Sequence, residues 1–525
     1  MANITQVNFS FAFASLPQLE THVVRFSGTA ALNSLYDLAI TLLLPTEAFE
    51  KTDIETLMSS RCSLTIDDSQ DRLIEHWPSA WKTSWHGLLT KLEVGSQAGQ
   101  YTFLEVCLGP TIGLLSGQLQ NRIHLDLSSL DVLKDSFRFG GLSADQFSIK
   151  AQKDAYPKRE FVFQYEEDLL DFVWRTLWRE GLCLFYDQNG QSDLALVTDA
   201  PEQHPCCYDG SSEIGFSYSS LTGLKGDGPQ IFSMRSENRL PPNSILLKDY
   251  NWEDPNRPLA VKVRVSPKGR GEVHLYGQNF TTLAEGQRLG NIRRDEYLSN
   301  SETFRAVTRA PGLMPGLTFA INSHPIASNN DRFLVTSSEI IGSQADRLTA
   351  VLGLDLGTEK SDFTNNLKFR RLDKPFRPSL TLPRSKISGS LTAWIDGSGG
   401  GATPELDQWG RYKVLFPLDV SGRSQGKASA WLRMAQPYVG KGYGQNFPLT
   451  PGAEVLITFI DGNPDRPVIS GAVPNAENIS LINSATNTYS GLGTKGGSAL
   501  LFGDEAGKQK ISLTSGSNRA GLTIN

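Results

Sequence analysis

The chain has 525 residues, of which 39% are hydrophobic and 20% are charged, a composition that supports several folded domains and excludes a disordered chain. Its formal net charge is −6, so the chain as a whole does not attract nucleic acid electrostatically. The 48 glycines and 27 prolines are typical of a turn-rich, mainly β protein.

The N-terminal segment 9–15 (FSFAFAS) alternates between large and small side chains. No Lys or Arg precedes Arg25, so this segment lacks the positive region of a secretory signal. The period of two predicts a buried first strand instead. We therefore expect the protein to be made in the cytoplasm and to leave the cell, if it leaves, without a signal peptide.

Residues 1–155 read as a β-rich region. Apolar residues fill 42–44, and large and small side chains alternate in 63–66 and 101–106, as in half-buried strands. Three tryptophans in this region stand four residues apart, but a proline and a glycine nearby oppose a long helix, so we interpret them as core or interface anchors. They are Trp77, Trp81 and Trp85.

The strongest helix prediction covers residues 166–180 and begins with Glu166, Glu167 and Asp168. Apolar residues recur at helical spacing along it, and Gly181 is expected to end it. The acidic cluster could be a catalytic carboxylate pair, but negative charge at a helix start is better explained by capping and by the helix dipole.

Residues 182–345 return to a mixed β pattern, with a polar surface helix predicted at 284–297 despite two glycines there. His204, Cys206 and Cys207 offer potential metal ligands, but their spacing does not match a zinc site, so buried or loop thiols are expected. The five cysteines are too few, and odd in number, for a disulfide framework.

A proline-rich, basic connector follows at 371–386, and residues 387–474 then predict a compact β module. The five expected strands are 391–395, 411–416, 430–435, 454–460 and 467–473. Five short strands separated by Gly and Pro turns fit an OB-fold. The module has seven basic and seven acidic residues, a balance that disfavours a nucleic-acid groove.

Residues 475–525 are about half Gly, Ser, Asn and Thr, and they cannot bury enough apolar surface alone. They form either a floppy tail or a structure that folds only when copies of the chain wrap together. Apolar alternation at 511–513 and 522–524 favours the second interpretation.

Motifs for catalysis are absent from the sequence. It contains neither the zinc motif HExxH nor the nucleophile motif GxSxG, and a faint Walker-like Gly426-Lys427 has Ser421 and Ala428 where Gly and Ser or Thr are required. We therefore predict a structural protein rather than an enzyme, with no catalytic, cofactor-binding or metal-binding residues.

The sequence resembles the VgrG family, the trimeric spike of type VI secretion, over nearly its whole length. The segments that carry the resemblance occur in the family's order. They are 85–90 (WHGLLT), 157–165 (PKREFVFQY), 168–181, 315–325, 407–417 (DQWGRYKVLFP), 431–437 (WLRMAQP) and 462–467 (GNPDRP).

This resemblance implies a mainly β fold with minor α, in which two related β-barrels per chain form a hub. The hub would occupy 1–155 and 156–370, with the helix in its second part. After the linker 371–386, an OB-fold neck at 387–474 would lead into an intertwined trimeric β-helix needle beginning at 475–525. Family members usually carry a longer needle, so we expect either a truncated chain or a short member.

The implied function is that of a homotrimeric spike and hub that pierces target envelopes and carries effectors. Its implied partners are a hexameric Hcp-like tube protein, a PAAR-type tip protein or effector, and baseplate proteins, with no nucleic acid. One alternative is the spike hub of a phage tail or of an extracellular contractile particle. Others are a cell-wall glycan hydrolase with an OB-type accessory domain and a sugar-binding adhesin.

Overall fold

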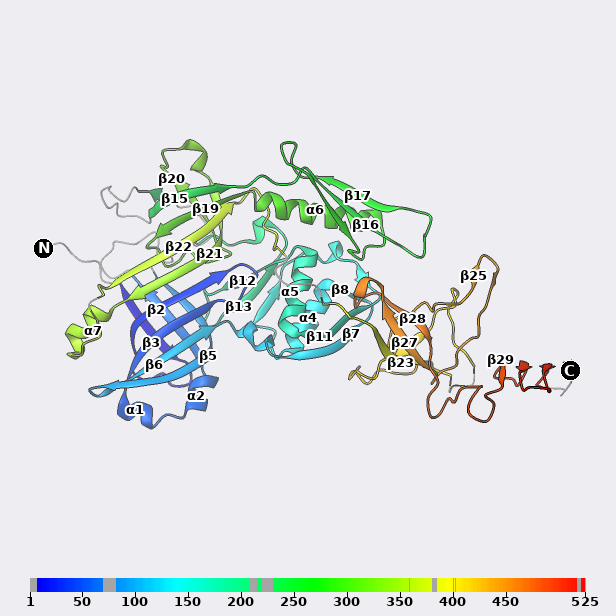
Figure 1. The fold of residues 1–525 in the computed structure, drawn as a ribbon. Helices are drawn as coiled ribbons and strands as arrows, with labels where there is room; N and C mark the ends of the chain where they lie inside the picture. Colours follow the sequence, from blue (N-terminus) through cyan, green and yellow to red (C-terminus); the bar gives the residue numbers. More distant parts are fainter. Residues whose placement is uncertain are drawn as a thin grey trace. The chain divides into compact units, whose positions relative to one another are not determined.

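The computed structural model describes residues 7–68, 82–207, 215–219, 230–357, 359–379, 385–399, 401, 403–516 and 521–524. Internal contacts divide the chain into two compact units. The first contains residues 1–119, 128–157 and 168–383, and the second contains residues 120–127, 158–167 and 384–525. Strands dominate the regular structure (Figure 1), which confirms the mainly β prediction.

Six strands form the first half of a twelve-stranded sheet in the first unit. In ladder order they are β1 (Asn8–Phe13), β4 (Arg61–Asp67), β5 (Lys82–Ala98), β6 (Tyr101–Gly109), β3 (Asp37–Pro45) and β2 (His22–Ala31). Phe9, Phe11 and Phe13 are buried on one face of β1, so the predicted first strand is confirmed. The strands predicted at 42–44, 63–66 and 101–106 are confirmed within β3, β4 and β6.

A buried side chain links the two ends of this half-sheet. The Gln344 amide accepts a hydrogen bond from the backbone N–H of Phe9 on β1, with an N–O distance of 3.3 Å. Its Nε2 donates to the carbonyl oxygens of Phe9, at 3.1 Å, and of Val23 on β2, at 2.6 Å. The side chain thus joins β1 and β2 by supplying backbone groups with partners where strand pairing does not.

The other six strands form a closed barrel. In ladder order they are β21 (Arg332–Ser343), β20 (Thr318–Asn322), β14 (Gly215–Tyr218), β15 (Gln230–Asn238), β19 (Glu302–Thr308) and β22 (Asp362–Arg371). The barrel closes because β21 also pairs with β22, and β21 pairs with β2 of the first half. A cluster of phenylalanines that includes Phe304, Phe319, Phe333 and Phe369 fills its core with ring contacts of 5.1–5.8 Å.

Two helices pack together in the first unit, namely α4 (Ser129–Phe139) and α5 (Leu169–Glu180). The predicted helix at 166–180 is correct in its end, since Gly181 takes the left-handed conformation there. Its predicted start is wrong by three residues, because Glu166 and Glu167 belong to β11 (Val162–Asp168). A three-stranded sheet of β12 (Cys183–Asp187), β13 (Leu194–Thr198) and β9 (Phe147–Ile149) completes this region.

The predicted surface helix is confirmed as α6 (Leu283–Ser299), which packs on β16 (Ser244–Asp249) and β17 (Leu259–Arg264), beside β18 (Glu272–Tyr276). Its glycines do not break it. A Cβ on Gly286 would lie 2.7 Å from the Phe280 ring, and one on Gly290 would lie 2.6 Å from a methyl group of Val263. Both glycines therefore allow the helix to approach the sheet closely.

The remaining short elements of the first unit and its borders connect these layers. They are α1 (Thr46–Glu50), α2 (Ile54–Ser59), α7 (Ala345–Leu352), β8 (Leu127–Ser128), β10 (Lys158–Arg159) and the 3₁₀ turns Thr111–Leu115, Lys153–Ala155, Pro201–Gln203 and Ala327–Asn329. Trp85 is buried against Tyr36, with a ring distance of 5.3 Å, as expected of a core anchor. Trp77 and Trp81 lie outside the described residues. Within the described ranges, no helix combines the length and apolarity needed to cross a membrane.

The second unit contains a small β module. Its sheet orders β24 (Lys413–Leu415), β23 (Ser390–Asp396), β27 (Glu454–Phe459) and β28 (Pro467–Ala472), which confirms four of the five predicted strands. The strand predicted at 430–435 is wrong. Leu432 and Met434 make only isolated β-bridges. The backbone N–H of Val414 donates a hydrogen bond to the Ser429 hydroxyl and not to a neighbouring strand.

The module's core also uses residues from far earlier in the sequence. Ile123 of β7 (Leu119–His124) and Phe163 of β11 are buried in the same cluster as Phe416. The Phe163 ring lies 5.6 Å from that of Phe416, and its backbone N–H donates to the Asp465 carboxylate at 2.8 Å. The module at 387–474 therefore depends on two segments that precede it in the sequence by more than two hundred residues.

Replacing Gln344 by Ala should destabilise the first unit by about 3 kcal/mol, because it leaves buried backbone groups of Phe9 and Val23 without partners. The faster hydrogen exchange that follows should be confined mainly to β1 and β2. Exposed Gln287→Ala, on α6, serves as the matched control and should leave exchange there unchanged. Equal protection of β1 in wild type and Gln344→Ala would show that this amide does not hold the seam.

Candidate assembly surface

The C-terminal residues form a four-stranded antiparallel sheet. Its strands, in order, are β29 (Tyr489–Gly493), β30 (Ala499–Gly503), β31 (Lys510–Thr514) and β32 (Gly521–Ile524). They follow one another as short rungs toward the C-terminus (Figure 1). The predicted alternation at 511–513 and 522–524 is thus confirmed as strand structure.

The strand register sorts side chains onto two unlike faces. Leu492 lies opposite Leu500, Leu500 opposite Leu513, and Leu513 opposite Leu522, so these four leucines share one face. A second file on that face places Phe502, Ile511 and Ile524 opposite one another. We call these seven residues the apolar face.

The opposite face of this sheet is mostly small or polar. It is formed by Tyr489, Gly491, Gly493, Ala499, Leu501, Gly503, Lys510, Ser512, Thr514, Gly521 and Thr523. One glycine here is required by packing, since a Cβ on Gly491 would lie 2.3 Å from the carbonyl oxygen of Leu500.

The apolar face has no cover within the described chain. Leu513, Leu522 and Ile524 are 54%, 60% and 57% exposed. A sheet of this size gains stability only by packing a hydrophobic face against something, and contiguous exposed apolar patches mark contact sites. The sheet is therefore built for burial against another surface.

Exposed hydrophobic side chains continue into the β module. Fifteen of the 27 large hydrophobic residues exposed in the described part of the chain lie between 406 and 524. Tyr438 and Tyr443, whose rings lie 5.2 Å apart, flank a hairpin of β25 (Val439–Gly440) and β26 (Tyr443–Gly444). Burial is thus incomplete through most of the second unit, whereas the closed barrel of the first unit buries its phenylalanine cluster.

One carboxylate holds the turn at residues 407–411 (DQWGR) together. Asp407 accepts hydrogen bonds from the backbone N–H groups of Trp409 and Arg411, both at 2.9 Å, and from Nε of Arg411 at 2.6 Å. Burial opposes ionisation of Asp407, but these hydrogen bonds prevail and lower its pKa. The turn projects Trp409 outward, where its side chain is 55% exposed and the Arg411 guanidinium lies over its ring.

Two further aromatic residues of the module take different places. Phe416 is buried in the core of the module. Trp431 is half-buried, and the Lys413 ammonium lies 5.2 Å from its ring centre.

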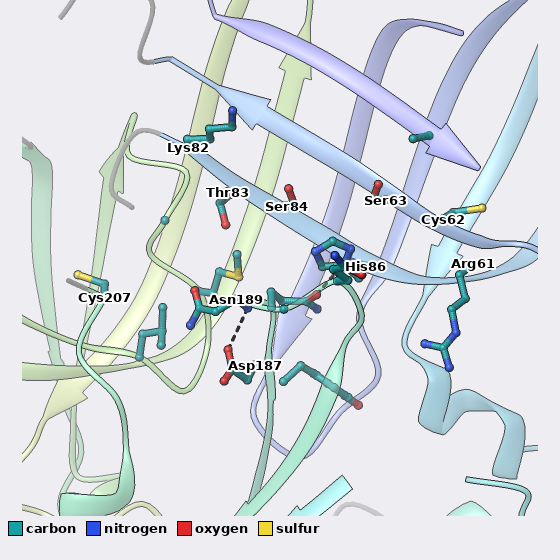
Figure 2. A pocket seen from close by; sticks show the side chains of 18 of the residues that line it. Arg61, Cys62, Ser63, Lys82, Thr83, Ser84, His86, Asp187, Asn189 and Cys207 are labelled. Carbon is teal, nitrogen blue, oxygen red and sulfur yellow. Dashed lines mark hydrogen bonds between the residues drawn. The ribbon is translucent and has the colours of Figure 1, made fainter. Parts of the chain in front are cut away.

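A polar hollow of about 470 Å³ opens in the first unit beside β4 and β5 (Figure 2). Figure 2 shows His86, Asp187, Asn189 and Arg61 around it, with the Asn189 N–H bonded to the Asp187 carboxylate at 3.0 Å. Burial lowers the pKa of His86 and raises that of Cys62 to about 12. A thiol with that pKa stays protonated near neutral pH, so Cys62 supplies no thiolate nucleophile.

The predicted weak metal candidates are engaged in packing. The His204 ring lies 5.0 Å from that of Phe185, and its Nδ1 is 3.0 Å from the carbonyl oxygen of Gly316. Burial lowers the pKa of His204 to about 4, which keeps the imidazole neutral. Cys207 is buried in the phenylalanine cluster, and the described residues contain no group of three metal-ligating side chains.

The acidic cluster before α5 is a cap rather than a reacting pair. Asp168 accepts from the N–H of Leu170 at 2.9 Å and from the N–H of Gly117 at 2.6 Å. Capping was the favoured interpretation, and it holds for Asp168. The exposed apolar face was visible in the sequence only as weak alternation, because register decides which residues share a face.

Known protein families match most of the chain. The model of the phage tail baseplate hub (GPD) matches residues 29–345. The model of the type VI secretion system/phage-baseplate injector OB domain matches residues 405–473.

Curated relatives match it along most of its length. The type VI secretion system spike protein VgrG5 of Pseudomonas aeruginosa is 26% identical, over 91% of this chain and 58% of its own length. VgrG4b of the same organism is 26% identical, over 96% of this chain and 62% of its own length. The chain thus spans about three fifths of these relatives.

Solved structures show the same fold. The E. coli type VI secretion component c3393 gives a TM-score of 0.61 at 18% identity, covering 88% of this chain and all of that one. The Francisella PdpA–VgrG complex gives 0.64 at 11% identity, covering all of this chain and 80% of that one. The hub model alone covers more than half of the chain, so the chain belongs to the phage tail baseplate hub (GPD) family, and the curated relatives that it resembles are VgrG spike proteins.

Proposed function

We propose that three copies of this chain form the hub and spike at the tip of a contractile type VI secretion tube, which pierces target envelopes and carries effectors. The observation that carries the proposal is the apolar face, which no part of the described chain covers. Its curated relatives are named as type VI secretion spike proteins, which supports this system over other contractile particles.

Three-fold assembly would supply the missing cover. Three apolar faces turned toward a common axis bury one another, and each fully buried Leu, Ile or Phe contributes about 2 kcal/mol. The small and polar opposite face then meets solvent. Residues 475–525 would thereby begin an intertwined needle, as the 387–474 neck module leads into it.

The hub ranges 1–155 and 156–370 would bear on the tube, with 371–386 as the connector to the neck. Each chain supplies two six-stranded sheet halves, so a trimer would present six similar elements. Six matches a hexameric, Hcp-like tube protein below the hub. Baseplate proteins would hold the hub from outside.

At the needle end we propose a PAAR-type tip protein or an effector. A VgrG protein has been solved in complex with PdpA, which supports the view that relatives carry further proteins. The chain would be made and assembled in the cytoplasm and ejected without a signal peptide, with the target membrane pierced mechanically. No nucleic-acid partner is proposed.

The proposed role is mechanical, without catalysis. Force transmission needs a stiff body with few free strand edges, which closed barrels and an obligate interface supply. The relatives are named for a spike and not for a reaction, and none of the matches points to a glycan hydrolase.

The mass in solution tests the assembly. Native mass spectrometry should give three times the 57.6 kDa chain mass. Replacing Leu513 and Leu522 together by Asp puts charge into the centre of the apolar face and should dissociate the trimer into monomers. The matched control is Ser512→Asp with Thr523→Asp, an opposed pair on the same two strands but on the other face. A monomeric wild type, or equal dissociation by both pairs, would refute the proposed packing.

Secretion tests the function. In the bacterium that encodes the chain, the Leu513→Asp/Leu522→Asp variant should abolish release of the tube protein into the medium, while Ser512→Asp/Thr523→Asp should preserve it. Immunoblotting of medium against cell lysate gives the readout. If the tube protein is released without the chain, and the chain is recovered in sheared phage-like tails, the chain would belong to the alternative contractile particle.

A further inference from the structure

A row of three positive charges crosses adjacent strands of the closed barrel. Arg235 on β15 lies directly opposite Arg305 on β19, and Arg305 lies directly opposite Lys368 on β22. Adjacent strands are about 4.8 Å apart, so the row spans roughly 10 Å. Like charges directly opposite one another destabilise a sheet, so the fold itself gains nothing from this arrangement.

Nearby acids compensate the row only in part. Glu237 lies 2.7 Å from the Arg239 guanidinium but 3.5 Å from that of Arg305, so Arg239 is its closer partner. Arg305 remains 65% exposed. Burial, together with the charges of Arg305, Arg370 and Arg239, lowers the pKa of Lys368 despite the opposing charge of Glu237.

The row lines a hollow of about 620 Å³. Ser233, Ser337 and Asn366 line it as well and add neutral hydrogen-bonding groups beside the cations. We call these six residues the basic groove: Ser233, Arg235, Arg305, Ser337, Asn366 and Lys368.

The strand β15 is distorted where it enters the groove. Its pairing with β19 shifts register between Phe232 and Arg235, and Ser233 within this bulge has a φ of 51°. A left-handed conformation is unfavourable for a non-glycine residue, and bulges commonly redirect side chains at binding sites. The distortion brings Arg235 into line with Arg305.

We propose that the basic groove binds an acidic segment of a partner polypeptide, whose carboxylates pair with Arg235, Arg305 and Lys368. Guanidinium groups bind carboxylates through two parallel hydrogen bonds, which suits the two arginines. This inference rests on residues other than the apolar face and does not require the proposed trimer.

Carboxylates fit the groove better than a nucleic-acid backbone does. Only three cations form the row, Glu339 also lines the hollow, and the chain as a whole carries −6. Nucleic-acid tracks need a longer run of basic and aromatic side chains. The short row matches a few carboxylates spaced along one extended peptide.

Fluorescence anisotropy of a labelled peptide of alternating Glu and Gly, at about 50 mM salt, tests the proposal while charge screening is weak. The peptide should bind the full chain at least about tenfold more tightly than its Gln–Gly counterpart, since paired charges add to neutral hydrogen bonds. The Arg235→Gln/Arg305→Gln/Lys368→Gln variant should lose that preference. The matched control Lys248→Gln/Arg257→Gln/Arg264→Gln removes three exposed cations of the β16–β18 region and should keep it.

The thermal unfolding midpoint of the same variants separates binding from folding. Removing the row should leave the midpoint unchanged or raise it, because repulsion is relieved. A lower midpoint would show that the row serves the fold and would overturn the proposal. So would equal affinity for the Glu and Gln peptides, or affinity for single-stranded DNA that matches the acidic peptide and depends on the row.

Discussion

One constraint shapes the molecule: the apolar face of the C-terminal sheet has no cover among the residues that the structure describes. Leu492, Leu500, Leu513 and Leu522 stand in one file because antiparallel register places them opposite one another. The sheet has no second layer within the described chain, so its stability must come from another surface. The first unit is the contrary case, since its closed barrel encloses a phenylalanine core without help. The protein thus combines a closed barrel that encloses its own core with a sheet whose apolar face the described residues leave uncovered.

The first unit needs no further partner for these strand edges, because their backbone groups are hydrogen-bonded within the unit. The second barrel closes by strand pairing alone, because β21 pairs on both sides. The first half reaches a similar result with one side chain, Gln344, at the seam between β1 and β2. Paired edges neither aggregate nor slide easily, which suits a body that passes on a mechanical load. The same requirement makes an amide acceptable in a hydrophobic interior, where each of its hydrogen bonds is made.

The sequence predicts local structure well where periodicity and burial agree. The alternation in β1 and the end of α5 at Gly181 were both correct, because each follows from neighbouring residues. The predicted start of α5 was wrong, because Asp168 is the residue that caps the helix, and Glu166 and Glu167 belong to the strand before it. The place of Phe163 in the second unit's core was missed, because no local pattern reports a contact with Phe416. The outward direction of Trp409 could not be predicted either, because the Asp407–Arg411 turn, not the hydrophobicity of the side chain, sets it.

Two surfaces of the molecule are unfavourable for its stability, and the physical cause differs between them. The apolar face exposes leucines that water disfavours, whereas the basic groove holds like charges against one another on adjacent strands. Burial of apolar groups is strengthened by salts that are excluded from protein surfaces, and exposed charge pairs are weakened by screening. Contacts at the two surfaces therefore respond to ionic strength in opposite directions. In the proposed spike, charge-based contacts could therefore be exchanged without loosening the apolar ones.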